Sequence, residues 1–344
     1  MNYDEVENLI NDHLNYYGDQ HLIALSGKIT TLKWQQIVAR IVKRLQPKCF
    51  LVSGNGLATE IKSGLFNWIP ELDAIAHSEG EDVIIKMAYD ARMIRNKGIK
   101  QAENSGKLAP YFLGIHQGRP RFAYDGGRPA DLDNIPFPAW DLLSSDINGY
   151  PILENYIKAP VWGTGASNSS ATSFNMSRSL TMISSRGCPF ACNFCNAGDE
   201  YFKAVNKFSD DYVNEEFTDI AKQATKAGIS GAILADNNFG MIPRDSKTSQ
   251  LFYDLQQKYA WPHTVTTCTG KNSKERVIEA TRLLGDTLSV TMSVQSMDED
   301  VLKNIKRDNI RLEDYREISK ELAEKKRTRN AEVIAPLPGE TLES

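Results

Sequence analysis

The sequence contains no hydrophobic run long enough to cross a bilayer, because no stretch approaches the ~18 to 20 consecutive apolar residues that a spanning helix needs. The N-terminal segment is acidic and lacks the basic-then-apolar pattern of a secretory signal. We therefore expect the protein to be cytoplasmic, with no membrane span.

The sequence also lacks a strong charge of one sign. Its 40 basic and 44 acidic residues give a net charge of −4, which provides no general electrostatic attraction to nucleic acid. The one basic stretch, Lys325 to Arg329, is short and typical of a solvated helix end. We therefore expect no nucleic-acid partner; the expected partner is a small-molecule substrate.

Cysteine is scarce and unevenly placed. Of the five cysteines, Cys188, Cys192 and Cys195 lie close together, whereas Cys49 and Cys268 are isolated. An odd count with one tight cluster does not suit the disulfide framework of a small secreted protein. A reducing compartment and a metal site fit better.

Residues 1–95 alternate between strand-like and helix-like segments. The expected strands are His21 to Ser26, Cys49 to Ser53 and Leu72 to Ala76, and the expected helices include Thr31 to Leu45 and a helix ending near Arg95. This alternation predicts an α/β domain with a parallel sheet. The Gly-rich turn at 54–56 follows a strand, so it either receives a ligand or only makes a tight turn.

The periodicity fades over residues 96–178, where Pro, Gly, Ser and Asn are frequent. This composition predicts an irregular connector that packs through Trp140. A connector of this length is expected to be partly functional or to cap a neighbouring domain.

A second α/β alternation covers residues 179–344. The expected strands are Leu180 to Ser185, Gly231 to Ala235, Thr264 to Thr269, Leu288 to Val294 and Glu332 to Ala335. The expected helices are Asp210 to Lys226, Ser249 to Tyr259, Ser273 to Leu284, Glu299 to Lys306 and Leu312 to Lys326. Such repeats predict a parallel barrel or part of one, and the polar motifs fall at the carboxyl ends of the strands, where barrel sites lie.

The cysteine cluster has the spacing C-x3-C-x2-C. Three thiolates on a short loop can each hold one iron of a cubane 4Fe–4S cluster and leave the fourth iron open to a ligand. The alternative is a structural zinc site. Zinc prefers four ligands, and no second Cys pair or nearby His completes such a set.

This segment resembles the radical S-adenosylmethionine (SAM) superfamily, in which C-x3-C-x-aromatic-C follows the first barrel strand; Phe194 is the aromatic residue here. The resemblance implies a 4Fe–4S cluster on Cys188, Cys192 and Cys195, with SAM chelating the open iron. It further implies cleavage of SAM to a 5′-deoxyadenosyl radical, with an electron donor such as a flavodoxin or ferredoxin.

The resemblance also assigns residues to SAM. Asp236, Asn237 and Asn238 stand where family members contact the SAM amino group, although their pattern departs from the common Gly-Glu form. The alternative is an Asn-rich helix-capping turn.

Farther along, Ser293 and Gln295 are candidates for the SAM ribose, Arg307 for its carboxylate, and Ile334 for the adenine. As an alternative, Asp298 caps a helix and Arg307 makes a surface pair.

The expected fold of this half is an incomplete (β/α)6 partial TIM barrel, with five of the family's six strands. The segment over Ala335 to Thr341 resembles the fifth-strand element, and the sequence ends shortly after it.

Within residues 1–95, the segments Leu51 to Thr59, Pro70 to Ala74 and Glu79 to Glu81 resemble the later part of a Rossmann-like cobalamin-binding domain, with its usual first strand and helix missing and no His ligand for cobalt. The resemblance places cobalamin near Ser26, Gly27, Ser53, Gly54, Gly56 and Glu79. The alternative is a vestigial α/β domain that only packs on the barrel.

The leading interpretation is a radical SAM enzyme of the cobalamin-binding subgroup that methylates, cyclises or rearranges a substrate; neither the substrate nor a catalytic residue can be identified. One alternative is a cobalamin-independent enzyme that resembles the methylthiotransferases. Another is a truncated, non-catalytic iron–sulfur protein.

Overall fold

The computed structural model describes residues 3–104, 111–116, 119–129, 131–140, 179–198, 202–269, 274–309, 313, 316 and 330–341. The chain divides into two compact units, Met1–Asp131 and Leu132–Ser344. The first unit extends past the expected boundary at residue 95, because two strands within the expected connector complete its sheet. Among the described residues, no helix is long and apolar enough to cross a membrane.

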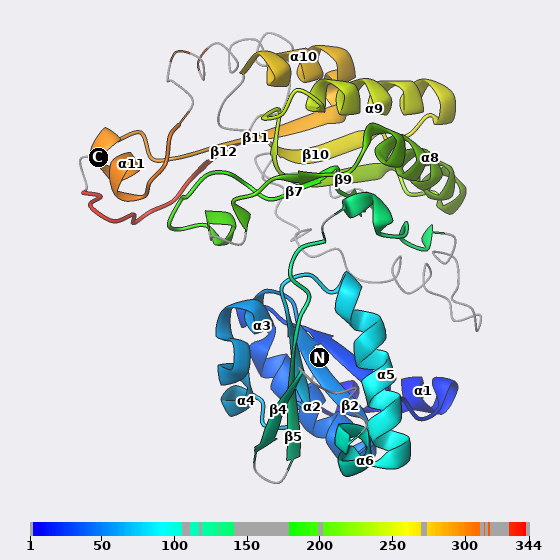
Figure 1. Cartoon of the computed structure of the whole chain (residues 1–344). Helices are drawn as coiled ribbons and strands as arrows, with labels where there is room; N and C mark the ends of the chain where they lie inside the picture. The colour runs from blue at the N-terminus through cyan, green and yellow to red at the C-terminus, as the bar shows by residue number, and fades with distance from the viewer. Residues whose placement is uncertain are drawn as a thin grey trace. The chain divides into compact units, whose positions relative to one another are not determined.

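The first unit is an α/β fold built on a five-stranded sheet of order β1-β2-β3-β5-β4 (Figure 1). Its neighbouring strands pair in parallel except β4, which is antiparallel to β5 at the edge. The strands are β1 (Leu22–Ser26), β2 (Phe50–Gly54), β3 (Ala74–His77), β4 (Phe112–His116) and β5 (Arg119–Asp125). The helices are α1 (Tyr3–Tyr17), α2 (Leu32–Leu45), α3 (Gly56–Ile61), α4 (Leu65–Trp68), α5 (Glu81–Lys97) and α6 (Ile99–Asn104).

Alternate side chains of β2 belong to two separate cores, one on each face of this sheet. Leu51 packs in the cluster that contains Leu57 of α3, whereas Val52 packs in the cluster that contains Met87 of α5 and Phe122 of β5. A strand buried on both faces reads as a continuous apolar run, which is why Cys49 to Ser53 was predictable.

The second unit contains a five-stranded sheet of order β12-β11-β10-β9-β6, in which every neighbouring pair is parallel (Figure 1). Its strands are β6 (Ser179–Met182), β9 (Gly231–Phe239), β10 (Thr264–Thr269), β11 (Leu288–Gln295) and β12 (Asn330–Val333). Its helices are α8 (Asp210–Ala227), α9 (Asp245–Tyr259), α10 (Lys274–Leu284) and α11 (Glu299–Asn304). All five expected strands are confirmed, and the expected helix over 312–326 lies almost entirely outside the described residues.

Helices α8, α9 and α10 bury one face of this sheet. Phe217 of α8 and Phe252 of α9 are fully buried with their ring centroids 5.5 Å apart, in a core shared with Leu234 of β9. On the other face, Ala235 and Asn237 alternate with these buried positions and are exposed. Among the described residues, these two side chains of β9 are therefore accessible near the carboxyl ends of the strands, where barrel sites lie.

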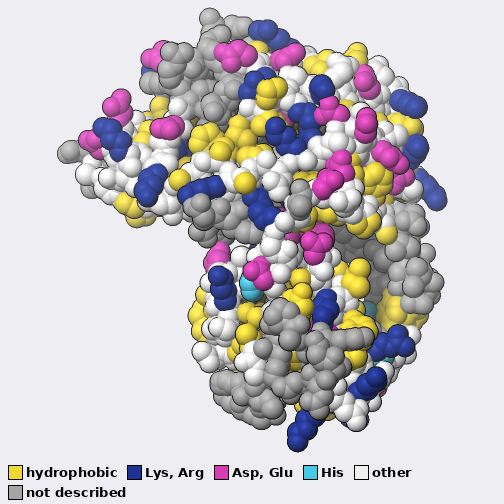
Figure 2. All heavy atoms as spheres, in the orientation of Figure 1, with side chains coloured by type: hydrophobic (Ala, Val, Ile, Leu, Met, Phe, Trp, Pro, Cys, Tyr) yellow, Lys and Arg dark blue, Asp and Glu magenta, His cyan; other side chains and the backbone are white. Residues whose placement is uncertain are grey.

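Charges of both signs are interspersed on the face of the molecule in Figure 2. Among the described residues visible there, basic side chains form no continuous patch, in keeping with the small net charge of −4.

Candidate functional site

The three clustered cysteines lie on one tight loop after β7 (Ser185–Arg186), which pairs with β8 (Asn206–Lys207). Cys188 and Cys192 are buried, whereas Cys195 is exposed. The Cys188 N–H donates to the carbonyl of Phe202 at 2.7 Å, and the Cys195 N–H donates to the carbonyl of Cys192 at 3.2 Å. Backbone hydrogen bonds therefore fix the loop that carries the thiols.

Two glycines make this loop possible. Gly187 has φ +109, and a Cβ there would overlap the carbonyl oxygens of Phe202 and Ala204. A Cβ at Gly198 would overlap the carbonyl oxygen of Cys192. Both positions need glycine because the backbone approaches too closely for any side chain.

Asp236 ties the start of the loop to β9. Its buried carboxylate accepts from the backbone N–H groups of Ser184 (2.7 Å) and Ser185 (3.2 Å) and from their hydroxyls at 2.5 and 2.9 Å. Residues 236–239 continue β9, so the helix-capping alternative for this motif is wrong.

Arg244, just before α9, supplies a second tie that the sequence analysis missed. Its guanidinium donates to the carbonyl oxygens of Ser184 and Phe208. Both acceptors are backbone oxygens, and Ser184 is 60 positions from Arg244 in the sequence. No local sequence motif therefore predicts the contact.

Two buried carboxyls with raised pKa values lie in the second unit. Burial raises the pKa of Asp245 to about 6, although its carboxylate accepts from the Gly240 N–H at 2.7 Å. Burial also raises the pKa of Glu216 to about 7, against the opposing charge of Arg186. The buried setting favours the neutral form of both groups.

Two side chains face the cysteine sulfurs. The Asn238 amide donates from Nδ2 to Cys188 Sγ at 2.9 Å. Arg307 is buried, and this burial lowers its pKa. The charges of the three cysteines and a hydrogen bond to Cys192 act in the opposite direction and raise the pKa. Its guanidinium lies 5.9 Å from the Phe194 ring centroid. Arg307 is therefore no surface residue, and the alternative that it makes a surface pair is wrong.

The aromatic residue of the motif, Phe194, packs the cysteine loop against the α11 segment and Leu337. Phe194 packs against a cluster formed by Val301, Ile305 and Leu337. The Asn193 N–H donates to the carbonyl of Ile305 at 3.2 Å. The loop is thus held by the α11 segment as well as by β9.

The expected ribose and adenine residues meet at the end of β11. The Ile334 N–H donates to the carbonyl of Gln295 at 3.0 Å, and the Ser293 carbonyl accepts from Arg307. Gln295 has φ +64, is 8% exposed, and its Oε1 has no hydrogen-bond partner among the described residues. A buried acceptor without a partner fits a site for a polar ligand such as the hydroxyls of a ribose.

The residues after β11 confirm one expectation and add one residue. Asp298 caps α11 by accepting from the Asp300 and Val301 N–H groups, both at 2.9 Å. Asn309, which the sequence analysis missed, donates to the carbonyl of Val294 at 2.8 Å and so holds the strand end.

The donor set fits an iron–sulfur cubane. Among the described residues, no three His, Cys, Asp or Glu side chains converge on a single metal ion. A cubane does not require such convergence, because each thiolate binds a different iron. Soft thiolates with an amide donor and a guanidinium beside them suit an anionic iron–sulfur cluster.

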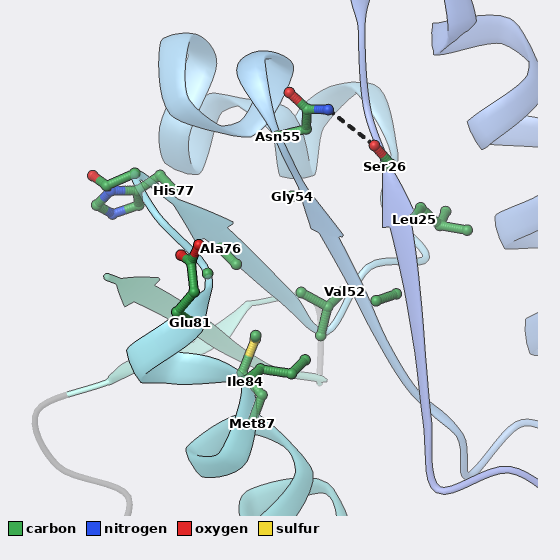
Figure 3. A pocket seen from close by; sticks show the side chains of 13 residues that line it. Leu25, Ser26, Val52, Gly54, Asn55, Ala76, His77, Glu81, Ile84 and Met87 are labelled. Atoms are coloured by element: carbon green, nitrogen blue, oxygen red, sulfur yellow. Dashed lines mark hydrogen bonds between the residues drawn. The ribbon is translucent and has the colours of Figure 1, made fainter. Parts of the chain in front are cut away.

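The first unit holds a pocket of about 520 Å³ at the carboxyl ends of β1, β2 and β3 (Figure 3). Its lining is mostly apolar and includes Val52, Ile84 and Met87, and Asn55 Nδ2 donates to Ser26 Oγ at 3.0 Å beside it. This edge of a parallel sheet is where α/β folds bind ligands. The apolar surface fits the hydrocarbon face of a corrin ring, and the rim offers hydrogen bonds to its amide groups.

The pocket contains two of the six residues predicted for cobalamin. Ser26 and Gly54 line it, and Gly27, Ser53, Gly56 and Glu79 do not. Ser53 is fully buried, and its hydroxyl donates to Gln35 Oε1. Glu79 Oε1 lies 3.7 Å from Arg128 Nε, so the two residues form an ion pair. The sequence analysis missed Ile84 and Met87, because an apolar face of a helix looks the same whether it covers a core or a ligand.

Comparison with known proteins shows what the second unit is similar to. Residues 182–344 match the family model described as the radical SAM superfamily. Two curated relatives align with 94% of this chain, and each is 25% identical to it over that alignment. They are "Cobalamin-dependent radical SAM methyltransferase TokK" of Streptomyces tokunonensis and "2-(S-pantetheinyl)-carbapenam-3-carboxylate methyltransferase" of Streptantibioticus cattleyicolor. The chain spans 43% of the length of each relative.

Solved structures share the fold of both units. The radical SAM methyltransferase TsrM from Kitasatospora setae, with tryptophan and a SAM analogue bound, matches 99% of this chain and 61% of its own, with a TM-score of 0.67 and 13% identity. The cobalamin-dependent radical enzyme OxsB, with aqua-cobalamin bound, matches 95% of this chain and 42% of its own, with a TM-score of 0.61 and 16% identity. The expected fold, a Rossmann-like unit followed by a partial barrel, is confirmed.

Proposed function

Residues 182–344 of this chain belong to the radical SAM superfamily, and we propose that the protein is a cobalamin-dependent radical SAM methyltransferase acting on a small molecule. The observation that carries the proposal is the loop of Cys188, Cys192 and Cys195 at the carboxyl edge of a parallel sheet, with an amide and a guanidinium directed at its sulfurs. When bound, the cluster and SAM supply the 5′-deoxyadenosyl radical, and cobalamin supplies the transferred methyl group.

The chain's own residues bind and orient in this proposal. Asp236 fixes the start of the loop, and the ring of Phe194 anchors its end. Asn237, exposed on β9, is proposed for the SAM amino group, and Gln295, whose buried Oε1 has no partner among the described residues, for the ribose.

Cobalamin is proposed for the pocket of the first unit. The apolar lining and the ligand-binding edge of the sheet support this assignment, as do the names of the curated relative and the OxsB structure. The flavodoxin or ferredoxin electron donor and the cytoplasmic location belong to the same proposal.

The test is anaerobic reconstitution with iron and sulfide, followed by incubation with SAM and a reductant. We expect the chain to hold a 4Fe–4S cluster and to release 5′-deoxyadenosine. Replacing Cys188, Cys192 or Cys195 with Ser is expected to remove the cluster spectrum and the product, whereas Cys268→Ser, outside the loop, retains both.

A zinc-loaded protein, or variants with unchanged iron content, would overturn the proposal. Cobalamin retained after desalting, read from the visible spectrum, separates the cobalamin-dependent enzyme from a cobalamin-independent one. Release of 5′-deoxyadenosine excludes a non-catalytic iron–sulfur protein.

A further inference from the structure

The side-chain amide of Asn238 on β9 donates a hydrogen bond to the sulfur of Cys188, one of the proposed cluster ligands. The Nδ2 of Asn238 lies 2.9 Å from Cys188 Sγ, and the two residues are 8% and 6% exposed. Asp236, two positions earlier on the same face of β9, holds the loop that carries Cys188. The amide and the sulfur are therefore positioned by the same strand, largely shielded from water.

A donor in this position favours the reduced form of a cluster. One-electron reduction adds negative charge to the cluster and its sulfur ligands, and hydrogen bonds to these sulfurs help to set the reduction potential. A hydrogen bond to an ionised acceptor is stronger than one between neutral groups, and low local dielectric strengthens it further.

We propose that Asn238 is a positioning residue that raises the reduction potential of the cluster by donating its amide N–H to the Cys188 sulfur. The proposal rests on the proposed function, since it requires the cluster on the three cysteines. The electron comes from an external reductant, and the amide keeps its proton. This role differs from the SAM contact predicted from the sequence, because the amide nitrogen already has a partner.

The experiment uses the full chain, reconstituted anaerobically and studied without SAM. Asn238→Leu removes the donor at nearly constant size, and Asn238→Asp replaces it with an acceptor of the same shape. The matched control is Asn193→Ala, which removes an amide of the same loop that donates to the Asn304 carbonyl instead of to sulfur. The measurements are iron per chain and a redox titration followed by electron paramagnetic resonance.

We expect both Asn238 variants to retain iron and to show a more negative midpoint potential. A threefold to tenfold fall in the equilibrium constant for reduction corresponds to about 28 to 59 mV for a one-electron couple. Asn193→Ala is expected to leave the midpoint unchanged.

The outcomes separate the two proposals. Wild-type protein that holds no cluster overturns the proposed function and this inference together. Wild-type protein with a cluster and an unchanged midpoint in both Asn238 variants overturns the inference alone. Loss of iron from both variants also overturns it, because a residue that only adjusts the potential is not needed to hold the cluster.

Discussion

At the scale of single residues, the start of the cysteine loop depends on Asp236. Four hydrogen bonds from Ser184 and Ser185 converge on its two carboxylate oxygens. An amide at this position would offer one acceptor oxygen and place a donor nitrogen against the remaining N–H and O–H groups.

Asp236→Asn is therefore expected to lower the free energy of unfolding by about 1–3 kcal/mol, the cost of leaving buried donors unsatisfied. It is also expected to reduce the iron bound per chain after reconstitution, because the loop loses its fixed start. Denaturant unfolding and iron analysis measure the two effects.

The control is Asp254→Asn on the exposed side of α9, where the carboxylate accepts from the Gln250 amide at 2.9 Å. Equal unfolding free energies for the wild type and Asp236→Asn would contradict the assigned role.

The sequence predicted some of these residues and not others for a physical reason. Cys188, Cys192 and Cys195 share a short spacing, so their chemistry is visible in one segment of sequence. Arg244 and Asn309 act on backbone carbonyl oxygens 60 and 15 positions away, and a carbonyl carries no sequence signal.

At the scale of elements, the turn before Cys188 is the tightest part of the site. Gly187→Ala is expected to displace the loop, because its Cβ would meet backbone oxygens and cannot be relieved by a rotamer change. We expect much lower iron content and a lower melting temperature, measured by iron analysis and circular dichroism.

Gly228→Ala provides the comparison for Gly187→Ala. Gly228 also has positive φ (+68), but it ends α8 with open space around it. Alanine there is expected to cost about 1 kcal/mol of stability without loss of iron. Equal iron content in the two variants would contradict the steric argument.

Helix α5 offers a second test, because adjacent isoleucines differ in their surroundings. Ile84 lines the pocket of the first unit, whereas Ile85 is 79% exposed and does not. With cobalamin bound, Ile84→Glu would place a charge against the apolar face of the corrin ring, so we expect cobalamin to bind about tenfold or more weakly.

Binding is measured from the visible spectrum during a cobalamin titration. Ile85→Glu adds the same charge outside the pocket and is expected to bind cobalamin as the wild type does. Equal weakening by the two variants would assign cobalamin to some other place.

At the scale of the whole molecule, two buried carboxyls are expected to contribute less to stability as the pH rises toward neutrality. Burial raises the pKa of Glu216 from 4.5 to about 7, so the folded state binds its proton more tightly than the unfolded state does. Its stabilising effect is complete below pH 4.5 and is lost as the pH approaches 7. Asp245, with a pKa of about 6, acts in the same direction.

Glu216→Gln is expected to flatten the fall in melting temperature between these pH values, as measured by calorimetry. Glu215→Gln, its exposed neighbour on α8, is the matched control and should keep the wild-type slope. A slope unchanged by Glu216→Gln would refute the assignment of the effect to this carboxyl.

The strands of both sheets were largely predictable because most of them contain apolar or β-branched residues and are followed by a turn. The β4–β5 hairpin was not, since its segment mixes Gly114 and Pro120 with polar residues and shows no clear period. Its place in the first unit follows from pairing with β3, a contact between segments far apart in the chain.

The docking of Phe194 onto Val301, Ile305 and Leu337 has a consequence for biosynthesis. The thiols emerge from the ribosome well before the residues around position 337, which complete the surface that holds their loop. Stable capture of iron is therefore expected to follow synthesis of the chain through Leu337, so that the metal content of purified protein reports how much of the second unit has reached its native packing.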